Sequence, residues 1–239
     1  FILGRREAFV PGRAGLLAGL FYGLSTMAFV AAVYHTTTAN VVFIVAFSPM
    51  FAALLSWIFL RENPSRSTLF AMGAMVVGVV IIVGGGLAAG HVFGDLLALL
   101  ASVLIAAGLT TARASGKPMG FVPLLASAIP AAISLGFAWP EGLTMQAPAW
   151  ALLDGLVLMP LAFWLLATAP RYLPAAEVGM FYLLETVLAP IWMWMIFREV
   201  PSTATLFGGT LIICALLAHS LVGLRARQAG RLSTQSPTP

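Results

Sequence analysis

Three carboxylates lie inside long apolar runs of the sequence, where an acid is costly to bury. Glu185 is the tenth residue of the run 176–197, and Glu177 is the second. Asp154 lies five residues into the run 150–169. An ionised acid at the centre of a membrane-spanning helix costs about 2.5–3.5 kcal/mol on insertion scales, so such residues usually face a bundle interior or a wet cavity. A carboxylate in that position can bind a cationic or amine-bearing molecule, or carry a proton.

Glu185 is the strongest candidate among these acids for a functional carboxylate. On a helix, one stripe about 100° wide mixes carboxylates and aromatic rings. It contains Glu177, Phe181, Leu184, Glu185, Leu188 and Trp192. This mixture is typical of a wall that faces a substrate, and Tyr182 and Trp164 would add further rings. The alternative is that Glu185 is protonated or hydrogen-bonded and joins two helices.

Other acids have simpler interpretations. Glu177 follows Pro174 and falls in the first turn of its helix, where an acid complements the helix dipole. Asp95 follows Gly94 and is expected to be a first-turn acid as well. Asp154 is close to one end of its run, so contact with the membrane interface and a role in binding both stay open.

The composition places these residues in a membrane. Hydrophobic residues make up 61% of the 239 residues and charged residues 8%, whereas a soluble domain carries about 25% charged residues. A run of about 20 apolar residues crosses a bilayer as a helix. Eight such runs of 18 to 22 residues occur, at 14–34, 40–60, 69–87, 95–112, 120–139, 150–169, 176–197 and 204–222. The polar residues 225–239 are expected to form a disordered cytoplasmic tail.

The basic residues predict the orientation of the chain. If the loops alternate between two sides, eleven of the twelve Lys and Arg residues lie with the N-terminal segment, and only Arg198 lies opposite. The positive-inside rule makes the first side cytoplasmic, so we expect eight spans in a plasma membrane, that of a bacterial inner membrane, with both ends cytoplasmic. The scattered charges form no basic patch, which argues against binding to nucleic acid.

An internal repeat relates two segments of the chain. Residues 57–70 and 194–207 match at a constant offset of 137 residues, with eight identities in fourteen positions. Five predicted spans separate the copies, so one Arg-Glu pair (Arg61, Glu62) lies inside and its counterpart (Arg198, Glu199) lies outside. Inverted repeats of this kind are a signature of transporters that work by alternating access. The pairs are interpreted as interface anchors or as gate contacts to another helix at each mouth.

The same offset connects polar residues in different runs. Asn40 and Ser48 correspond to Glu177 and Glu185. Transporters with inverted repeats bind their substrates where related polar faces meet near the midplane. We therefore expect Asn40 and Ser48 to contact a substrate, together with Tyr22 and Ser25, which follow helical spacing in the first run. Helix packing is the alternative for each of them.

Residues 39–65 resemble the fourth helix of EamA-type proteins of the drug/metabolite transporter superfamily. The marks are Pro49, then Glu62 thirteen residues later, then a span with Gly73 and Gly78. Residues 183–202 resemble the ninth helix, although Thr186 stands where proline is common. The resemblance implies a ten-helix bundle of two inverted five-helix repeats, of which this sequence lacks the first two helices.

On that basis, residues 1–90 are expected to hold the last three helices of the first repeat, and residues 91–224 the second repeat. The expected function is export or exchange of small organic metabolites, with a proton or ion as a coupling partner. A membrane-embedded enzyme and a passive channel or scaffold are the alternatives. No motif of a nucleophile, metal site or lipid-headgroup enzyme is found, and the single Cys and three dispersed His residues predict no metal or cofactor.

Overall fold

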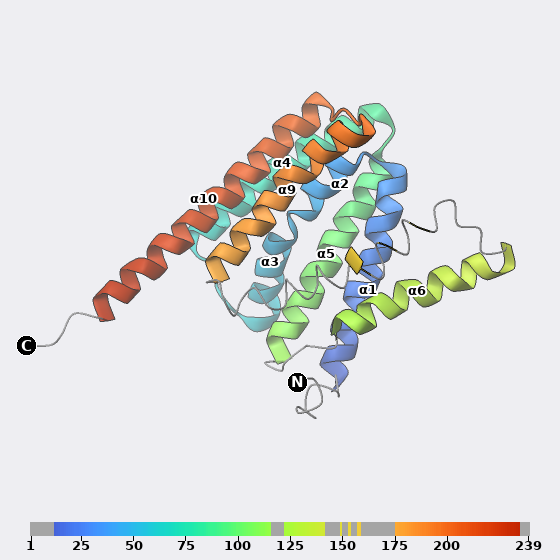
Figure 1. Cartoon of the computed structure of the whole chain (residues 1–239). Helices are drawn as coiled ribbons and strands as arrows, with labels where there is room; N and C mark the ends of the chain where they lie inside the picture. Colours follow the sequence, from blue (N-terminus) through green and yellow to red (C-terminus); the bar gives the residue numbers. More distant parts are fainter. Residues whose placement is uncertain are drawn as a thin grey trace, which may run out of the picture.

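The computed structural model describes residues 12–115, 122–141, 149, 153, 157, 158 and 175–234. These ranges are helical, and no strand occurs among them, as the composition predicts (Figure 1). In chain order the helices are α1 (Gly12–His35), α2 (Thr38–Val45), α3 (Ser48–Leu60), α4 (Arg66–Ala89), α5 (Val92–Ser115), α6 (Val122–Glu141), α9 (Ala175–Phe197) and α10 (Thr203–Thr234).

Five segments within the described ranges are long and apolar enough to cross a membrane. They are Gly12–His35, Thr38–Leu60, Arg66–Leu87, Val92–Ser115 and Thr203–Gly223. Each matches a predicted run within a few residues. Two shorter apolar stretches, Leu125–Gly136 and Thr186–Phe197, lie within α6 and α9. The run 150–169 falls almost entirely outside the described residues, so the count of eight spans stays a prediction.

The second predicted run is broken near its centre. α2 ends at Val45 and α3 begins at Ser48, with Pro49 in the first turn of α3. Proline has no N–H to donate to the carbonyl four residues earlier, and its ring clashes with that carbonyl. The bond from the Phe47 N–H to the Ile44 carbonyl (3.1 Å) closes a tighter turn instead. The prediction of one continuous helix over 40–60 is therefore wrong at this point.

The last helix is longer than predicted. α10 continues to Thr234, so residues 225–234 are helical and not the disordered tail that their polarity suggests (Figure 1). Arg225, Gln228, Ala229 and Leu232 in this segment are all strong helix formers, which explains the continuation.

Contacts between helix ends define the two ends of the bundle. Arg113 at the end of α5 pairs with Glu62 just after α3, and α4 begins nearby at Arg66. We call this the basic end. The Ala39 N–H at the start of α2 bonds Glu199 just after α9 (3.4 Å), which defines the opposite end. α2 and α3 therefore run antiparallel to α9.

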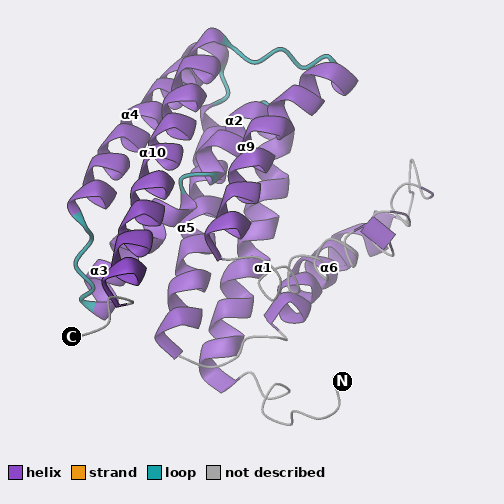
Figure 2. Ribbon diagram, turned by 60° about the vertical axis from the view of Figure 1, so that its left-hand side comes forward, coloured by secondary structure: helices purple, strands orange, loops and turns teal. Residues whose placement is uncertain are grey.

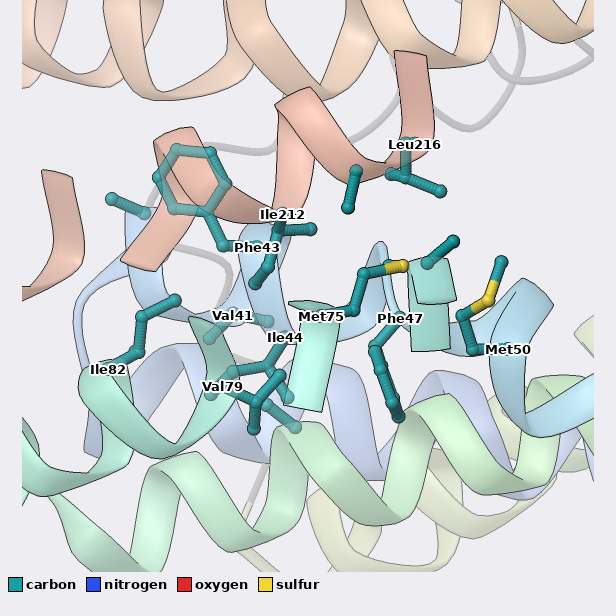
Figure 3. Packing of buried hydrophobic residues seen from close by; sticks show 14 of the residues in the cluster. Val41, Phe43, Ile44, Phe47, Met50, Met75, Val79, Ile82, Ile212 and Leu216 are labelled. Atoms are coloured by element: carbon teal, nitrogen blue, oxygen red, sulfur yellow. The ribbon is translucent and has the colours of Figure 1, made fainter. Parts of the chain in front are cut away.

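The apolar core lies between α2, α4 and α10. Phe43, Ile44, Met75, Ile82 and Ile212 from these three helices are buried against one another, as Figure 3 shows. At roughly 25 cal/mol per Å² of buried apolar area, such side chains contribute most of the packing free energy in water. Between helices in lipid, the packing free energy comes chiefly from close van der Waals contact, so the shapes of the packed side chains must match.

Glycines allow the helices of this bundle to approach closely. A Cβ at Gly78 of α4 would lie 2.8 Å from the Gly208 carbonyl oxygen of α10. Figures 1 and 2 both show α4 and α10 side by side. On α1, Cβ atoms at Gly19 and Gly23 would each lie 2.8 Å from side chains of α6, those of Leu125 and Ile129. Gly19 and Gly23, which are four residues apart on α1, thus allow α6 to pack closely against this helix.

Candidate functional site

The break between α2 and α3 places the Ser48 hydroxyl near the middle of a span, while the N–H groups of Phe47, Met50 and Phe51 bond carbonyls within the break (2.9–3.4 Å). Ser48 is the first residue of α3 and is half-buried. Discontinuous helices form ion and substrate sites in many transporters. The break therefore keeps Ser48 as a candidate, although the sequence interpretation did not foresee the break itself.

The other half of the predicted site is described less fully. Phe181, Tyr182 and Glu185 lie on α9, as predicted, and their side chains lie outside the described residues. Asp154 and Trp164 lie outside the described residues altogether. Thr186, the residue after Glu185, is half-buried on α9. Whether these groups meet Ser48 stays a prediction.

Tyr22 and Ser25 both lie on α1. The Ser25 side chain bonds the backbone of α1, and the Tyr22 ring contacts α5. The Ser25 hydroxyl is buried and donates to the Tyr22 carbonyl (2.7 Å). A Cβ at Gly108 of α5 would lie 3.0 Å from the Tyr22 ring. Ser25 is thus satisfied within its helix, and Tyr22 covers a glycine of α5. These contacts favour the packing alternative for Ser25.

Asn40 belongs to a buried polar cluster at the opposite end. Its Nδ2 donates to Asp95 Oδ1 (3.1 Å) and Thr36 Oγ1 (3.3 Å). Its Oδ1 accepts from Thr205 Oγ1 (2.5 Å). Thr36 Oγ1 also donates to Asp95 Oδ1 (2.7 Å). These four residues, which we call the Asn40 cluster, tie α2 to α5 and α10. The amide is fully occupied within the protein, and it lies at a helix end, away from the midplane where the repeat predicts a substrate.

Asp95 is the residue that the sequence interpretation underestimated. It is in the first turn of α5, as expected, but it is 0% exposed. Its Oδ2 is buried without a hydrogen-bond partner among the described residues and lies against Gly86 of α4, where any Cβ would collide with it. Gly86 was a sequence signal for this contact, because a glycine in a helix leaves room for a group from a neighbouring helix. The sequence does not show that this group is Asp95, because Asp95 lies on a different helix.

The basic end holds an ion pair and a cavity. Arg113 Nη2 lies 2.9 Å from Glu62 Oε2, and their side chains are 64% and 45% exposed. Glu62 thus contacts another helix at this end of the bundle, and its role as a gate stays a prediction. Beside the pair, a cavity of about 360 Å³ opens between α3, the following turn and α5. Ser56 and Thr110 line it, and both residues are buried.

The two Arg-Glu turns have the same local structure at opposite ends. Arg61 and Arg198 both adopt a left-handed conformation with φ of 57°, which ends α3 and α9. Among described non-glycine residues only these two have positive φ. Three residues after each Glu, a serine accepts from a threonine N–H: Ser65 from Thr68 (3.2 Å) and Ser202 from Thr205 (3.1 Å). The repeat seen in the sequence is therefore a repeat of structure in these turns.

The two glutamates of the turns have different partners. Glu62 pairs with Arg113, whereas Glu199 accepts from the Ala39 N–H in the first turn of α2. A carboxylate at a helix N-terminus is stabilised by the helix dipole. Glu199 thus helps to hold the opposite end together. No group of three or more His, Cys, Asp or Glu residues that could hold a metal ion occurs within the described ranges.

Comparison with known proteins identifies the family of this chain. The model of the EamA-like transporter family matches residues 3–84 and 92–221. Two curated relatives, each called pseudopaline exporter CntI, come from Pseudomonas aeruginosa strains UCBPP-PA14 and PAO1. Each is 24% identical over 231 residues, covering 92% of this chain and 80% of the relative. No solved structure matches significantly. The chain belongs to the EamA-like transporter family of membrane proteins.

Proposed function

We propose that the chain exports small organic metabolites by alternating access between two inverted repeats. The observation that carries the proposal is the pair of Arg-Glu turns, which share a left-handed arginine and a serine cap at opposite ends of the bundle. An inverted repeat predicts this arrangement, because each copy would stop its helix at a different membrane face.

The pairing of α4 and α10 supports the same symmetry. These helices correspond at the offset of 137 residues and pack antiparallel, with Gly78 against Gly208 and Gly85 against Ala204. The counterparts of Gly208 and Gly78 are Ala71 and Ala215, and both are buried. A twofold axis in the membrane plane that passes between α4 and α10 accounts for small residues at both positions. Residues 1–90 and 91–224 are then parts of the first and second repeats.

The contacts at the two ends suggest which conformation the structure represents. At the opposite end, the Asn40 cluster and Glu199 join α2 to α5, α9 and α10. At the basic end, a cavity opens between α3, the following turn and α5 beside an exposed ion pair. We assign the basic end to the cytoplasm of a bacterial inner membrane, with both ends of the chain inside, because it collects Arg13, Arg61, Arg66 and Arg113. The conformation is then closed outside and open inside.

We place the central substrate contact at the α2–α3 break. Ser48 would face Glu185, Tyr182 and Phe181 of α9 across the pseudo-symmetry axis, with Tyr22, Trp164 and Asp154 as further wall residues. Glu185 would bind an amine or carry the coupling proton. The chain would move solutes without chemical change, so we assign it no enzymatic role. Export, rather than exchange, follows the name of the curated relatives.

Spin-label distances test alternating access without a known substrate. In a Cys214→Ser background, one pair of labels is placed at Tyr34 and Val200, both exposed at the opposite end. A second pair is placed at Asn63 and Ala114, both exposed at the basic end. Double electron–electron resonance on the complete protein in lipid nanodiscs should show two populations. In one the outer distance is short and the inner long, and in the other the reverse.

Anticorrelated distances support the proposal. If both pairs lengthen together, or neither pair changes under any solute or pH gradient tried, the repeats do not exchange conformations and alternating access is wrong.

A further inference from the structure

Two arginines at the basic end have no acidic partner. Arg61 ends α3 and Arg66 is the first residue of α4, and both are exposed. Glu62 is the only acid in the turn that joins these helices, and it pairs with Arg113 (2.9 Å). Within the described ranges neither Arg61 nor Arg66 makes an ion pair. The α3–α4 turn therefore carries two positive charges that the protein does not compensate.

An exposed aromatic ring lies one helical turn from each of these arginines. Trp57 precedes Arg61 by four residues on α3, and Phe70 follows Arg66 by four residues on α4. Trp57 is 46% exposed and Phe70 is 81% exposed. Four residues of helix rise about 6 Å, so both rings lie nearer than the charges to the middle of their spans. The turn thus presents cations beside apolar surface at the level where lipid headgroups meet the hydrocarbon layer.

This combination fits one class of ligand. A phosphodiester carries its negative charge on paired free oxygens, and the planar guanidinium group of arginine binds such oxygens through parallel N–H donors. The acyl chains of a phospholipid extend from the phosphate into the apolar layer, where they would contact Trp57 and Phe70. A soluble phosphate would use only the arginines, whereas a phospholipid uses the charges and the exposed rings together.

The second Arg-Glu turn provides a comparison within the same chain. Its arginine and both aromatic rings are retained, as Arg198, Trp194 and Phe207, and both rings are exposed. The charge of Arg66 is not retained, because Thr203 occupies the corresponding position. The turn and its rings are therefore duplicated, whereas the pair of cations occurs in one copy only.

We propose that the α3–α4 turn is a binding site for an anionic phospholipid of the adjoining leaflet. Arg61 and Arg66 bind the phosphate, and the acyl chains lie against Trp57 and Phe70. Basic residues beside a membrane helix attract such lipids because they meet the negative charge at headgroup level. The inference goes beyond the proposed function, since it requires that the chain spans a membrane and not that it carries a solute.

Quenching of tryptophan fluorescence by brominated lipids measures which lipid lies beside each turn. Two variants of the complete protein each keep one tryptophan, either Trp57 or Trp194, and phenylalanine replaces the others. Each variant is reconstituted in bilayers of phosphatidylcholine and phosphatidylglycerol, in which one of the two lipids carries bromine on its chains. Because both leaflets have the same composition, the orientation of the protein does not affect the comparison.

The expected preferences follow from the number of arginines. Each arginine at the membrane surface strengthens the binding of an anionic lipid about fivefold. The preference for phosphatidylglycerol should thus be about 25-fold beside Trp57 and about fivefold beside Trp194, where Arg198 acts alone. Arg66→Gln should lower the first preference to about fivefold, and Thr203→Arg should raise the second to about 25-fold.

A matched control separates a site from general attraction to the basic end. Arg13→Gln removes an exposed charge at the same end, on α1, and should leave the preference beside Trp57 unchanged. An equal fall for Arg13→Gln and Arg66→Gln would show diffuse attraction, and equal preferences beside both tryptophans would show that no site exists. Displacement of phosphatidylglycerol by soluble glycerol 3-phosphate would assign the arginines to a free phosphate. Each of these three results overturns the inference.

A second measurement covers failure of the single-tryptophan variants to fold. Electron paramagnetic resonance with chain-labelled phosphatidylglycerol compares Arg66→Gln with Arg13→Gln in the otherwise unchanged protein. Arg66→Gln should weaken lipid association about fivefold and Arg13→Gln should not, and equal association in both variants again overturns the inference. No solute is present in either measurement, so the lipid site and alternating access stand or fall separately.

Discussion

Replacing Asn40 with alanine tests whether the Asn40 cluster serves stability or substrate binding. The change removes three side-chain hydrogen bonds, to Thr36, Asp95 and Thr205. Interhelical hydrogen bonds in a membrane protein average about 0.6 kcal/mol, so three contribute about 2 kcal/mol. The groups left behind keep other partners, since Asp95 Oδ1 still accepts from Thr36 (2.7 Å) and the Thr205 hydroxyl still pairs with Ser202 (2.8 Å). No penalty for an unpaired buried group is added, and we expect a total loss of about 2 kcal/mol.

Titration with SDS in mixed micelles measures this loss as a change in the free energy of unfolding, followed by tryptophan fluorescence. The matched control is Asn63→Ala, because Asn63 is exposed in the turn after α3. Surface substitutions of this kind usually change stability by less than about 0.5 kcal/mol. If Asn40→Ala unfolds like the control, the cluster does not hold the opposite end together. Loss of transport with unchanged stability would return Asn40 to the substrate site that the repeat suggests.

Three further predictions address packing, charge and orientation. Gly78→Leu should destabilise the bundle or prevent its assembly, because a Cβ there already meets Gly208 and Ile212. Gly73→Leu is the control and should not destabilise the bundle, because nothing lies within 4 Å of a Cβ at that position. Unfolding titrations of both variants measure the difference. Glu185→Gln should fold normally yet lose transport or its pH dependence in reconstituted vesicles, and full activity with an unchanged pH profile would remove Glu185 from the site. In a Cys214→Ser background, a cysteine at Val200 should react with an impermeant maleimide from outside the cell and one at Asn63 only after lysis, and the reverse pattern would invert the proposed orientation.

Hydropathy predicted most of the described helices because a span must be about 20 apolar residues long whatever its neighbours are. The ends of α1 and α5 fall within three residues of the predicted runs. The break at Pro49 was readable from the sequence, since a proline in the middle of a span removes a backbone bond. The helical segment 225–234 was missed because polarity was weighed and helix propensity was not.

The polar contacts were harder to predict because they join residues far apart in the chain. Asp95 was correctly placed in a first turn, yet its burial depends on Asn40, 55 positions earlier, and on Gly86 of α4. The offset of 137 residues assigned Asn40 to a substrate by symmetry. The repeat is only approximate, however: Thr205 and its counterpart Thr68 each bond the serine three residues earlier, but Thr205 also bonds Asn40 and is buried, whereas Thr68 lies at the surface. A pseudo-symmetric position can thus have different neighbours in each copy.

The twin Arg-Glu turns have a consequence for how the chain is made. In the orientation that we propose, one Arg-Glu turn stays on the side of synthesis and the other passes through the membrane, so the shape that they share cannot instruct the insertion machinery. What differs between the copies is charge and polarity: Arg66 corresponds to the uncharged Thr203, and the polar Asn63 to the apolar Val200. Flanking arginines resist translocation. In the proposed topology, orientation during biosynthesis is therefore set by a few side chains on an otherwise duplicated turn, and exchanging Arg66 with Thr203 should weaken the difference between the two turns that orients the chain.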